Sequence, residues 1–561
     1  MTPPVSSGMT PALPLLSIEH LNIALPRGGD RTLALDDVSI ALQAGEILCV
    51  VGESGSGKSM LANAVMGLLP DFLTPTQGRI MYQSQDLLTL AEPALRALRG
   101  ASIGMVFQEP LSALNPVMRV GEQIGEVFRV HGMRDARAVD AKVLELLEYV
   151  GLPDPDQLKL AYPFRLSGGQ RQRVMIAMAL ALEPSVLIAD EPTTALDVTT
   201  QAQILELIRS IQRRKKNALT GGMGVLFITH DFGVVAEIAD RVAVMEKGKV
   251  VEVGLAQSVL NAPSHPYTRR LIAAVPHRPS AGSAFNSGVS HQERAQVLEV
   301  KKLSKTYRSP SSIFGKRREV HAVKSVSFTL NKGETLGIVG ESGSGKSTVG
   351  KCLTRLIDAE SGSIVFRGQN LNGLSASAFR PLRKHLQMIF QDPFASLNPR
   401  QNVSTILTDG PVAHGEKYAS ALSRAVTLLQ LVGLDPGALH RFPNEFSGGQ
   451  RQRIGIARAL MLEPEIIVAD EAVSALDVSV QAQVLVLLKD IQRRLDLSLI
   501  FITHDLRVAA QLCDRVAVMH RGAIVELGSA AQIFEDPKHP YTQSLIAAIP
   551  GKGWVPPAVL A

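Results

Sequence analysis

The stretch Gly52-Glu53-Ser54-Gly55-Ser56-Gly57-Lys58-Ser59 decides the fold, and the chain repeats it as Gly340-Glu341-Ser342-Gly343-Ser344-Gly345-Lys346-Ser347. The first copy follows residues 47–51, a short and fully apolar run that is typical of a central strand in a parallel sheet. Residues 61–69 then have the composition of a helix that Pro70 stops. A G-x-x-x-x-G-K-[ST] motif between a strand and a helix is a phosphate-binding P-loop. The sequence therefore predicts an α/β fold in which each half of the chain holds one P-loop.

Four further motifs recur in the same order, which indicates an internal duplication. They are Ser167-Gly168-Gly169-Gln170 with Ser447-Gly448-Gly449-Gln450, Asp190-Glu191 with Asp470-Glu471, Thr229-His230-Asp231 with Thr503-His504-Asp505, and His265-Pro266-Tyr267-Thr268 with His539-Pro540-Tyr541-Thr542. A chain of 561 residues also exceeds the usual domain size of about 100–200 residues. We predict two tandem domains, residues 14–276 and 296–552, joined by a flexible linker rich in Pro, Gly and Ser at residues 277–295.

Composition excludes several classes of protein. The hydrophobic fraction of 45% and the charged fraction of 20% are those of a globular chain, not of a disordered one. No apolar run approaches the ~18–20 residues that a membrane-spanning helix needs, and the N-terminus lacks the pattern of a signal peptide. Cys49, Cys352 and Cys513 are too few and too far apart for a disulfide framework or a zinc site, so we expect buried structural thiols. The net charge of +6 does not distinguish among nucleic acid, membrane and nucleotide partners.

The repeated motifs carry the groups that phosphoryl transfer needs. Backbone N–H groups of each glycine-rich loop would wrap phosphates, Lys58 or Lys346 would add positive charge, and Ser59 or Ser347 would coordinate Mg²⁺. Apolar runs at residues 186–189 and 225–228 predict two more buried strands. At the ends of such strands, Asp190 and Asp470 would hold Mg²⁺ through water, Glu191 and Glu471 would polarise the attacking water, and His230 and His504 would reach the γ-phosphate. Residues 170–182 and 450–462 predict helices whose N-terminal N–H groups follow Ser-Gly-Gly.

These motifs resemble, over nearly the whole chain, the nucleotide-binding domains of ABC transporters. The resemblance implies two tandem nucleotide-binding domains, each with a mainly parallel core sheet and a helical subdomain, and ATP and Mg²⁺ as the bound groups. It identifies Gln108 and Gln391 as metal-binding Q-loop glutamines and Asp197 and Asp477 as D-loop aspartates at the nucleotide site. The nucleotide site would also include Met60 and Thr348, which follow the P-loops, and the signature motifs at 166–170 and 446–450. Each ATP would lie between the P-loop of one half and the signature motif of the other, with the two halves paired head to tail.

More narrowly, the chain resembles the peptide/nickel/opine import ATPases. The marks are residues 108–116, residues 391–399 and the two His-Pro-Tyr-Thr segments, whose physical role the sequence leaves open. The tandem form is most similar to the ATP-binding subunits of microcin C/oligopeptide and glutathione importers. The resemblance implies two integral-membrane permease subunits and an extracytoplasmic solute-binding protein as partners, no nucleic acid, and a peripheral location at the cytoplasmic face of the bacterial membrane.

Two alternatives and one asymmetry remain at this point. A non-transport ABC ATPase acting on the ribosome or DNA would show a long charged helical linker, coiled coils or zinc-type cysteines, and the ATPase of an exporter would lack the import marks. The family places an aromatic residue against adenine, and Tyr307 fills that place in the second half. Alignment puts Leu25 there in the first half, so we expect weaker adenine stacking at the Lys58 site.

Overall fold

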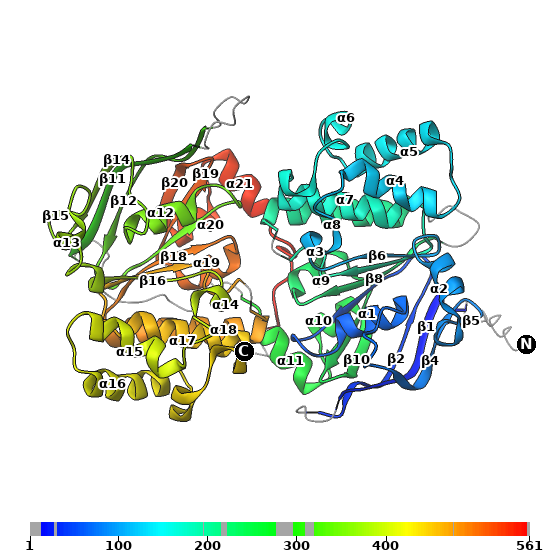
Figure 1. Cartoon of the computed structure of the whole chain (residues 1–561), viewed down its shortest axis with the longest axis horizontal. Helices are drawn as coiled ribbons and strands as arrows, with labels where there is room; N and C mark the ends of the chain where they lie inside the picture. Colours follow the sequence, from blue (N-terminus) through cyan, green and yellow to red (C-terminus); the bar gives the residue numbers. More distant parts are fainter. Residues whose placement is uncertain are drawn as a thin grey trace, which may run out of the picture. The chain divides into compact units, whose positions relative to one another are not determined.

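The computed structural model describes residues 13–26, 31–194, 196–214, 222–276, 295–308, 319–474 and 476–557. The chain divides into two compact units (Figure 1), the first made of Met1–Leu196, Thr200–Ala273 and Pro550–Ala561, the second of Asp197–Thr199 and Ala274–Ile549. The proposed linker, apart from its last residue, lies outside the described residues. The predicted boundaries at 14–276 and 296–552 therefore remain a prediction.

The first unit contains two sheets. An antiparallel sheet has the strand order β2-β1-β4-β5, and a six-stranded sheet has the order β10-β9-β3-β8-β7-β6, parallel throughout except for the edge strand β10. The strands are β1 (Leu16–Ala24), β2 (Leu33–Leu42), β3 (Ile47–Val51), β4 (Pro75–Tyr82), β5 (Gln85–Asp86), β6 (Ile103–Val106), β7 (Val186–Asp190), β8 (Gly224–Thr229), β9 (Arg241–Glu246) and β10 (Lys249–Leu255).

Helices of the first unit flank these sheets and also form a layer of their own. The α-helices are α1 (Lys58–Met66), α2 (Glu92–Leu98), α3 (Pro110–Ala113), α4 (Val120–Val130), α5 (Ala136–Tyr149), α6 (Pro155–Leu158), α7 (Gly168–Leu180), α8 (Val198–Arg214), α9 (Phe232–Ile238), α10 (Ala256–Asn261) and α11 (Pro266–Ala273). Figure 1 shows α4, α5 and α7 side by side, away from the antiparallel sheet, and these three helices pack against one another. This layer carries the start of α7, where the Ser-Gly-Gly motif lies.

The second unit repeats the same plan. Its sheets have the orders β12-β11-β14-β15 and β16-β17-β18-β13-β19-β20, with β20 antiparallel to β19. The strands are β11 (Gln296–Arg308), β12 (Glu319–Asn331), β13 (Thr335–Val339), β14 (Ser361–Phe366), β15 (Gln369–Asn370), β16 (Leu386–Ile389), β17 (Ile466–Asp470), β18 (Ser498–Thr503), β19 (Arg515–His520) and β20 (Ala523–Ser529). The α-helices are α12 (Lys346–Leu353), α13 (Ala376–Phe379), α14 (Pro393–Ser396), α15 (Val403–Ala413), α16 (Tyr418–Leu431), α17 (Gly448–Leu460), α18 (Val478–Leu495), α19 (Leu506–Leu512), α20 (Ala530–Glu535) and α21 (Pro540–Ala547).

The predicted fold class is confirmed. All five residues of β3 and of β13 are buried, and each strand lies between two parallel neighbours, as the fully apolar runs indicate. The predicted helix bounds were wrong by two or three residues. Helix α1 begins at Lys58 because Gly57 is its N-cap, and it ends at Met66 because Gly67 adopts a left-handed conformation with φ of 61°. Helices α7 and α17 begin at the first glycine of the motif because Ser167 and Ser447 cap them.

The three cysteines are buried thiols, as predicted. Burial raises the pKa of all three, that of Cys352 to about 11, so none is a thiolate at neutral pH. Within the described part of the chain, no helix combines the length and apolar character that crossing a bilayer requires.

Candidate functional site

The first P-loop joins the end of β3 to the start of α1. Gly52 has φ of 157°, and a Cβ there would lie 2.2 Å from the backbone oxygen of Met245, so only glycine fits. Gly57, with φ of 106°, is the N-cap of α1 and has no side chain to satisfy the first N–H groups of the helix. A helix start of this kind, preceded by a loop of backbone N–H groups, is suited to binding phosphate.

Lys58 is folded back onto its own loop. Its Nζ donates to the backbone oxygens of Gly52 at 2.8 Å and of Glu53 at 2.9 Å, and its side chain is buried. In the second unit, Lys346 makes the same contacts with Gly340 and Glu341, both at 2.8 Å. Burial, opposed by nearby carboxylates, lowers the pKa of Lys346. Both ammonium groups therefore lie in the loop that phosphates would enter.

Ser59 and Asp190 bring two hard oxygen atoms together beside the P-loop. Ser59 Oγ donates to Asp190 Oδ1 at 3.1 Å, and the equivalent bond from Ser347 to Asp470 measures 2.8 Å. Burial raises the pKa of Asp190 to about 6, against the hydrogen bond from Ser59, and raises that of Asp470 as well. Hydroxyl and carboxylate oxygens are ligands that Mg²⁺ accepts together with phosphate oxygens, so this pair fits the metal that the sequence implies.

Glu191 is held by three side chains. Its Oε2 accepts from Gln108 Nε2 and from Thr194 Oγ1, both at 2.9 Å, and its Oε1 lies 3.3 Å from His230 Nδ1. Burial works against ionisation, but the hydrogen bonds and charges of His230, Thr194 and Lys58 prevail and lower the pKa of Glu191 to about 2. The Glu191 carboxylate is therefore ionised at any physiological pH. The neighbouring Asp190 carboxyl, by contrast, has a raised pKa.

The second unit reproduces this arrangement with one difference. Glu471 Oε2 accepts from Gln391 Nε2 at 2.7 Å, and His504 Nδ1 lies 3.3 Å from Glu471 Oε1. The pKa of Glu471 is again lowered, and Glu471 raises the pKa of His504 against the effect of burial. The difference is Ser474, whose Oγ donates to the backbone oxygen of Glu471 at 3.0 Å and not to its carboxylate.

Both glutamates have an unusual backbone. The φ angle is 46° at Glu191 and 47° at Glu471, in the left-handed region that side chains other than glycine rarely adopt. In each unit the backbone N–H of this glutamate donates to an oxygen of the neighbouring strand, Ile228 O at 3.0 Å or Ile502 O at 2.9 Å. Adjacent strands therefore hold the strained residue in place.

The Q-loop glutamines contact the glutamates, whereas the prediction made them metal ligands. Gln108 follows β6 and Gln391 follows β16. Each of these strands pairs with the strand that ends at the Asp-Glu motif, so the glutamine lies next to the glutamate. Among the residues that the structure describes, each amide donates to the glutamate and not to the Ser-Asp oxygen pair. Metal coordination by Gln108 and Gln391 stays a prediction.

The signature serines cap their own helices. Ser167 Oγ accepts from Gln170 N at 3.2 Å while Gln170 Oε1 accepts from Ser167 N at 3.0 Å, and Ser447 and Gln450 form the same capping box. The D-loop aspartates Asp197 and Asp477 directly precede α8 and α18, and Asp197 groups with the second compact unit. The roles of these residues at a nucleotide stay predictions.

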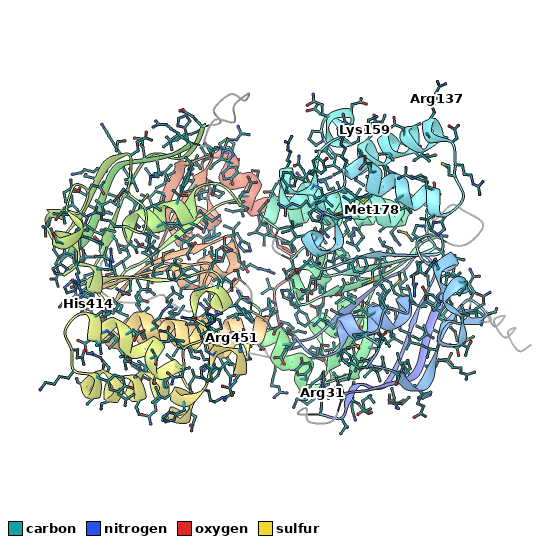
Figure 2. The ribbon with its side chains drawn as sticks, viewed as in Figure 1. Arg31, Arg137, Lys159, Met178, His414 and Arg451 are labelled. Carbon is teal, nitrogen blue, oxygen red and sulfur yellow. The ribbon has the colours of Figure 1, made fainter. Side chains whose placement is uncertain are left out.

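The two residues compared for adenine stacking differ in surroundings. Tyr307, near the end of β11, leaves 43% of its surface exposed, whereas Leu25 packs against the core of the first unit. Sequence patterns provided no reason to single out Arg31, which Figure 2 labels. Its guanidinium donates to the backbone oxygen of Gly55 in the P-loop at 2.7 Å. Tyr267 and Tyr541 also contact the P-loops, and the repeated His-Pro-Tyr-Thr segments were the signal that pointed to them.

Comparison with known proteins gives the family. A model of the ABC transporter family matches residues 35–194 and 323–474, and a model of the oligopeptide/dipeptide transporter C-terminal region matches residues 251–295 and 525–553. The chain is 46% identical to the glutathione import ATP-binding protein GsiA of Salmonella choleraesuis (strain SC-B67) over 563 residues, which cover 96% of this chain and 89% of the relative. The same protein of Escherichia coli O157:H7 matches with 46% identity and the same coverage. A solved dimeric ATP-binding cassette with ADP and Pi aligns with 43% of this chain and 98% of its own, at 28% identity and a TM-score of 0.38.

Proposed function

The chain belongs to the ABC transporter family of ATP-binding proteins, and on that basis we propose that it hydrolyses ATP to drive import of a small peptide of the glutathione class. The observation that carries the proposal is the pair of equivalent sites, in which Glu191 and Glu471 lie beside a P-loop with matching partners. The import relatives and the oligopeptide transporter C-terminal regions favour this function over a ribosome or DNA ATPase and over an exporter.

In the proposed reaction the P-loop N–H groups and Lys58 bind the phosphates of ATP and stabilise their charge. Mg²⁺, when bound, would neutralise charge between the β- and γ-phosphates, and Ser59 and Asp190 are the residues that would hold it. Glu191 is ionised and accepts a hydrogen bond from the attacking water, which orients the water towards the γ-phosphorus. His230 holds the Glu191 carboxylate from its other oxygen. The second unit uses the equivalent residues.

Replacing both glutamates by glutamine tests this role. Turnover of ATP by the Glu191→Gln, Glu471→Gln variant should fall by about 100-fold or more, because water orientation by a charged carboxylate is lost. Binding of ATP should persist, since neither carboxylate belongs to the phosphate-binding loop. Glu145→Gln, an exposed change on α5, is the matched control and should retain full activity. Wild-type turnover in the double variant would refute the assignment.

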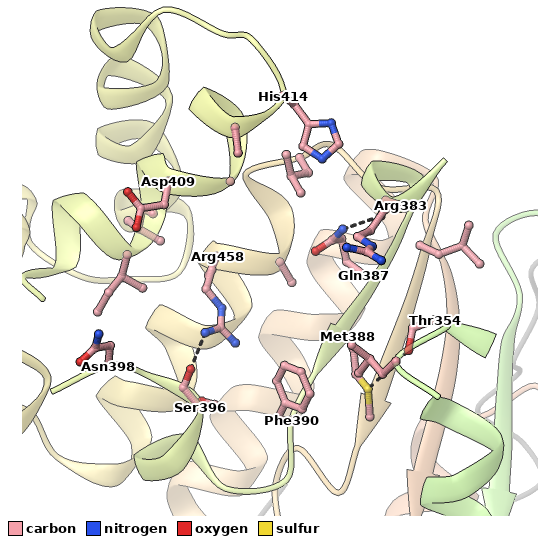
Figure 3. Close-up of a pocket in the computed structure, with 18 of the residues that line it drawn as sticks. Thr354, Arg383, Gln387, Met388, Phe390, Ser396, Asn398, Asp409, His414 and Arg458 are labelled. Carbon is pink, nitrogen blue, oxygen red and sulfur yellow. Dashed lines mark hydrogen bonds between the residues drawn. The ribbon is translucent and has the colours of Figure 1, made fainter. Parts of the chain in front are cut away.

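We propose two membrane permease subunits as partners, an extracytoplasmic solute-binding protein upstream of them, and a peripheral location at the cytoplasmic face of the membrane. The second unit offers a feature that suits a permease segment. A cavity of about 670 Å³ lies among β16, α14, α15 and α17, and Figure 3 shows its labelled lining. Phe390 and Ser396 line it, so the cavity adjoins Gln391, which holds the carboxylate of Glu471. A permease segment bound in this cavity would act on Glu471 through the side chain of Gln391.

Positive charge dominates this cavity. The described residues that line it include three arginines, Arg355, Arg383 and Arg458, and one acidic residue, Asp409. Arg355 also pairs with Asp358 at 3.1 Å. Arg458 donates to the backbone oxygen of Ser396, as drawn in Figure 3, and burial lowers the pKa of its guanidinium. A partly buried cation such as Arg458 gains from a carboxylate partner, so we propose that a permease segment with an acidic side chain docks here.

The first unit has a methionine, Met178, at the position that matches Arg458 (Figure 2). This difference supplies a matched experiment with the assembled transporter in vesicles and labelled glutathione. Arg458→Met should lower uptake and solute-stimulated ATPase activity while leaving ATP affinity unchanged, and Arg458→Lys should keep part of both. Uptake by Arg458→Met at the wild-type level would dismiss the docking proposal without affecting the ATPase assignment.

A further inference from the structure

The two His-Pro-Tyr-Thr segments form the starts of α11 and α21, and in both units the tyrosine contacts the P-loop. Tyr267 Oη accepts a hydrogen bond from the backbone N–H of Glu53 at 3.2 Å. Tyr541 Oη accepts from the backbone N–H of Glu341 at 3.3 Å. In the first unit 214 positions of sequence separate the two partners, so the contact is tertiary, and it is made twice with the same geometry.

In each unit a glutamate holds the backbone at the start of the motif and so positions the tyrosine. Glu252 on β10 accepts from the N–H groups of Ser264 at 2.7 Å and His265 at 3.1 Å, and His265 Nδ1 then accepts from Tyr267 N at 3.2 Å. The proline presets the backbone of the first helical turn, and Thr268 is buried. Each of the four residues of the motif therefore has a place at the start of this helix.

The second unit contains the same arrangement. Glu526 on β20 accepts from Lys538 N at 2.8 Å and His539 N at 3.1 Å, and His539 Nδ1 accepts from Tyr541 N at 3.1 Å. His539 is the N-cap of α21, and Pro540 is its first residue. The ring of Tyr541 also stacks on His520, with centroids 3.9 Å apart.

The tyrosine and the P-loop lysine hold the same peptide group. In the first unit the peptide between Gly52 and Glu53 offers its oxygen to Lys58 Nζ at 2.8 Å and its N–H to Tyr267 Oη. Phosphates that enter the loop would compete with the oxygens of Gly52 and Glu53 for the three N–H donors of the Lys58 ammonium. The tyrosine hydroxyl holds the N–H side of this peptide, where phosphates do not compete for the Lys58 ammonium. Burial raises the pKa of both tyrosines, that of Tyr541 to about 12, so the hydroxyls stay neutral at working pH.

We propose that Tyr267 and Tyr541 are positioning residues that keep the P-loop in its phosphate-binding shape while the lysine engages ATP. This inference rests on the proposed ATPase function, because it assigns a role in that same site to the C-terminal region of each unit. It explains why the His-Pro-Tyr-Thr segment accompanies the P-loop in both halves. Neither hydroxyl touches substrate in this role, and both act through the loop backbone.

Kinetics of a Tyr267→Phe, Tyr541→Phe variant of the full chain test the proposal. Loss of the tyrosine hydroxyl, with its hydrogen bond from the P-loop backbone, should raise the KM for ATP about 3–10-fold at each site, with kcat within about two-fold of wild type. Tyr82→Phe is the matched control, because it removes a tyrosine hydroxyl bonded to Ser185 Oγ at 2.7 Å, away from the P-loop. It should leave the KM unchanged, whatever it does to thermal stability.

A second pair of variants separates positioning from simple loss of folding. His265→Asn with His539→Asn keeps a capping acceptor and should leave the KM near wild type, whereas the alanine pair should raise it in the same direction as the phenylalanine variant. A KM equal to wild type in the Tyr→Phe variant would overturn the inference, as would a change confined to kcat or to the melting temperature. Failure of the wild-type chain to hydrolyse ATP would instead refute the proposed function, and this result differs from a failure of the tyrosine proposal alone.

Discussion

Replacing Asp190 by asparagine should stabilise the nucleotide-free protein, although the same change removes a proposed metal ligand. Asp190 is 4% exposed, and its pKa is raised from an ordinary value of 3.8 to about 6, with burial as the main cause. The folded state thus binds a proton more readily than the unfolded state, so the ionised carboxyl costs stability as pH rises. An asparagine side chain at this position would be neutral at every pH and can still accept the hydrogen bond from Ser59.

The size and pH range of this effect follow from the raised pKa. A pKa higher by about two, at about 1.4 kcal/mol for each unit, gives a stabilisation of about 3 kcal/mol at pH 7.5 for Asp190→Asn. The gain falls below about 1 kcal/mol at about pH 4, because there the carboxyl is protonated in the folded protein and partly so in the unfolded one. For a unit of this size, about 3 kcal/mol corresponds to a rise in Tm of about 6–12 °C.

Calorimetry of the nucleotide-free protein at pH 7.5 and at pH 4 measures this difference. Wild type should gain stability on addition of ATP with Mg²⁺, and Asp190→Asn should gain less, because the carboxylate is then paired with a cation in wild type only. Asp470→Asn should behave similarly, since the pKa of Asp470 is raised for the same reason. An Asp190→Asn protein no more stable than wild type at pH 7.5, or a gain independent of pH, would refute the reasoning.

Three further predictions concern adenine binding, coupling to the permease and the stability of α14. Leu25→Tyr should tighten ATP at the Lys58 site about 3–5-fold by adding a stacking ring, and Tyr307→Ala should weaken the second site similarly; titration of each variant with a fluorescent ATP analogue checks both. Glu109→Lys should impair uptake in the assembled transporter while leaving ATP affinity unchanged, and normal uptake would dismiss a role in coupling. Asp392→Lys should also lose about 1 kcal/mol of stability, because Asp392 caps α14 by accepting from two backbone N–H groups, which Asp392→Asn should preserve in thermal unfolding.

Local patterns in the sequence were sufficient for the fold. The apolar run at 47–51 became β3 with the predicted bounds, because a strand buried on both faces has a composition that few other elements share. Helix ends were less predictable. Gly67 ended α1 through a left-handed C-cap three residues before the predicted end, and the composition of the following residues, still apolar, concealed that stop.

The sequence patterns did not predict contacts between residues that lie far apart along the chain. The pairing of Gln108 with Glu191 depends on two strands lying next to each other, and the hydrogen bond from Glu53 to Tyr267 depends on where α11 ends up on the unit. The repeat drew attention to the tyrosine without showing its partner. Arg31 had no repeat to draw attention to it, and only the folded turn brings its guanidinium to Gly55.

The left-handed backbone at Glu191 and Glu471 has a consequence for protein engineering. A side chain in that conformation costs about 1–2 kcal/mol relative to glycine, and asparagine tolerates it better than glutamate. Replacing Glu191 by glycine or asparagine would relieve this strain, but it would also remove the ionised carboxylate that Gln108, Thr194 and His230 hold and whose lowered pKa stabilises the folded state at neutral pH. Selection for thermal tolerance alone therefore acts on two opposed effects at these positions, and a turnover screen in each round is the measure that selects directly for the glutamates.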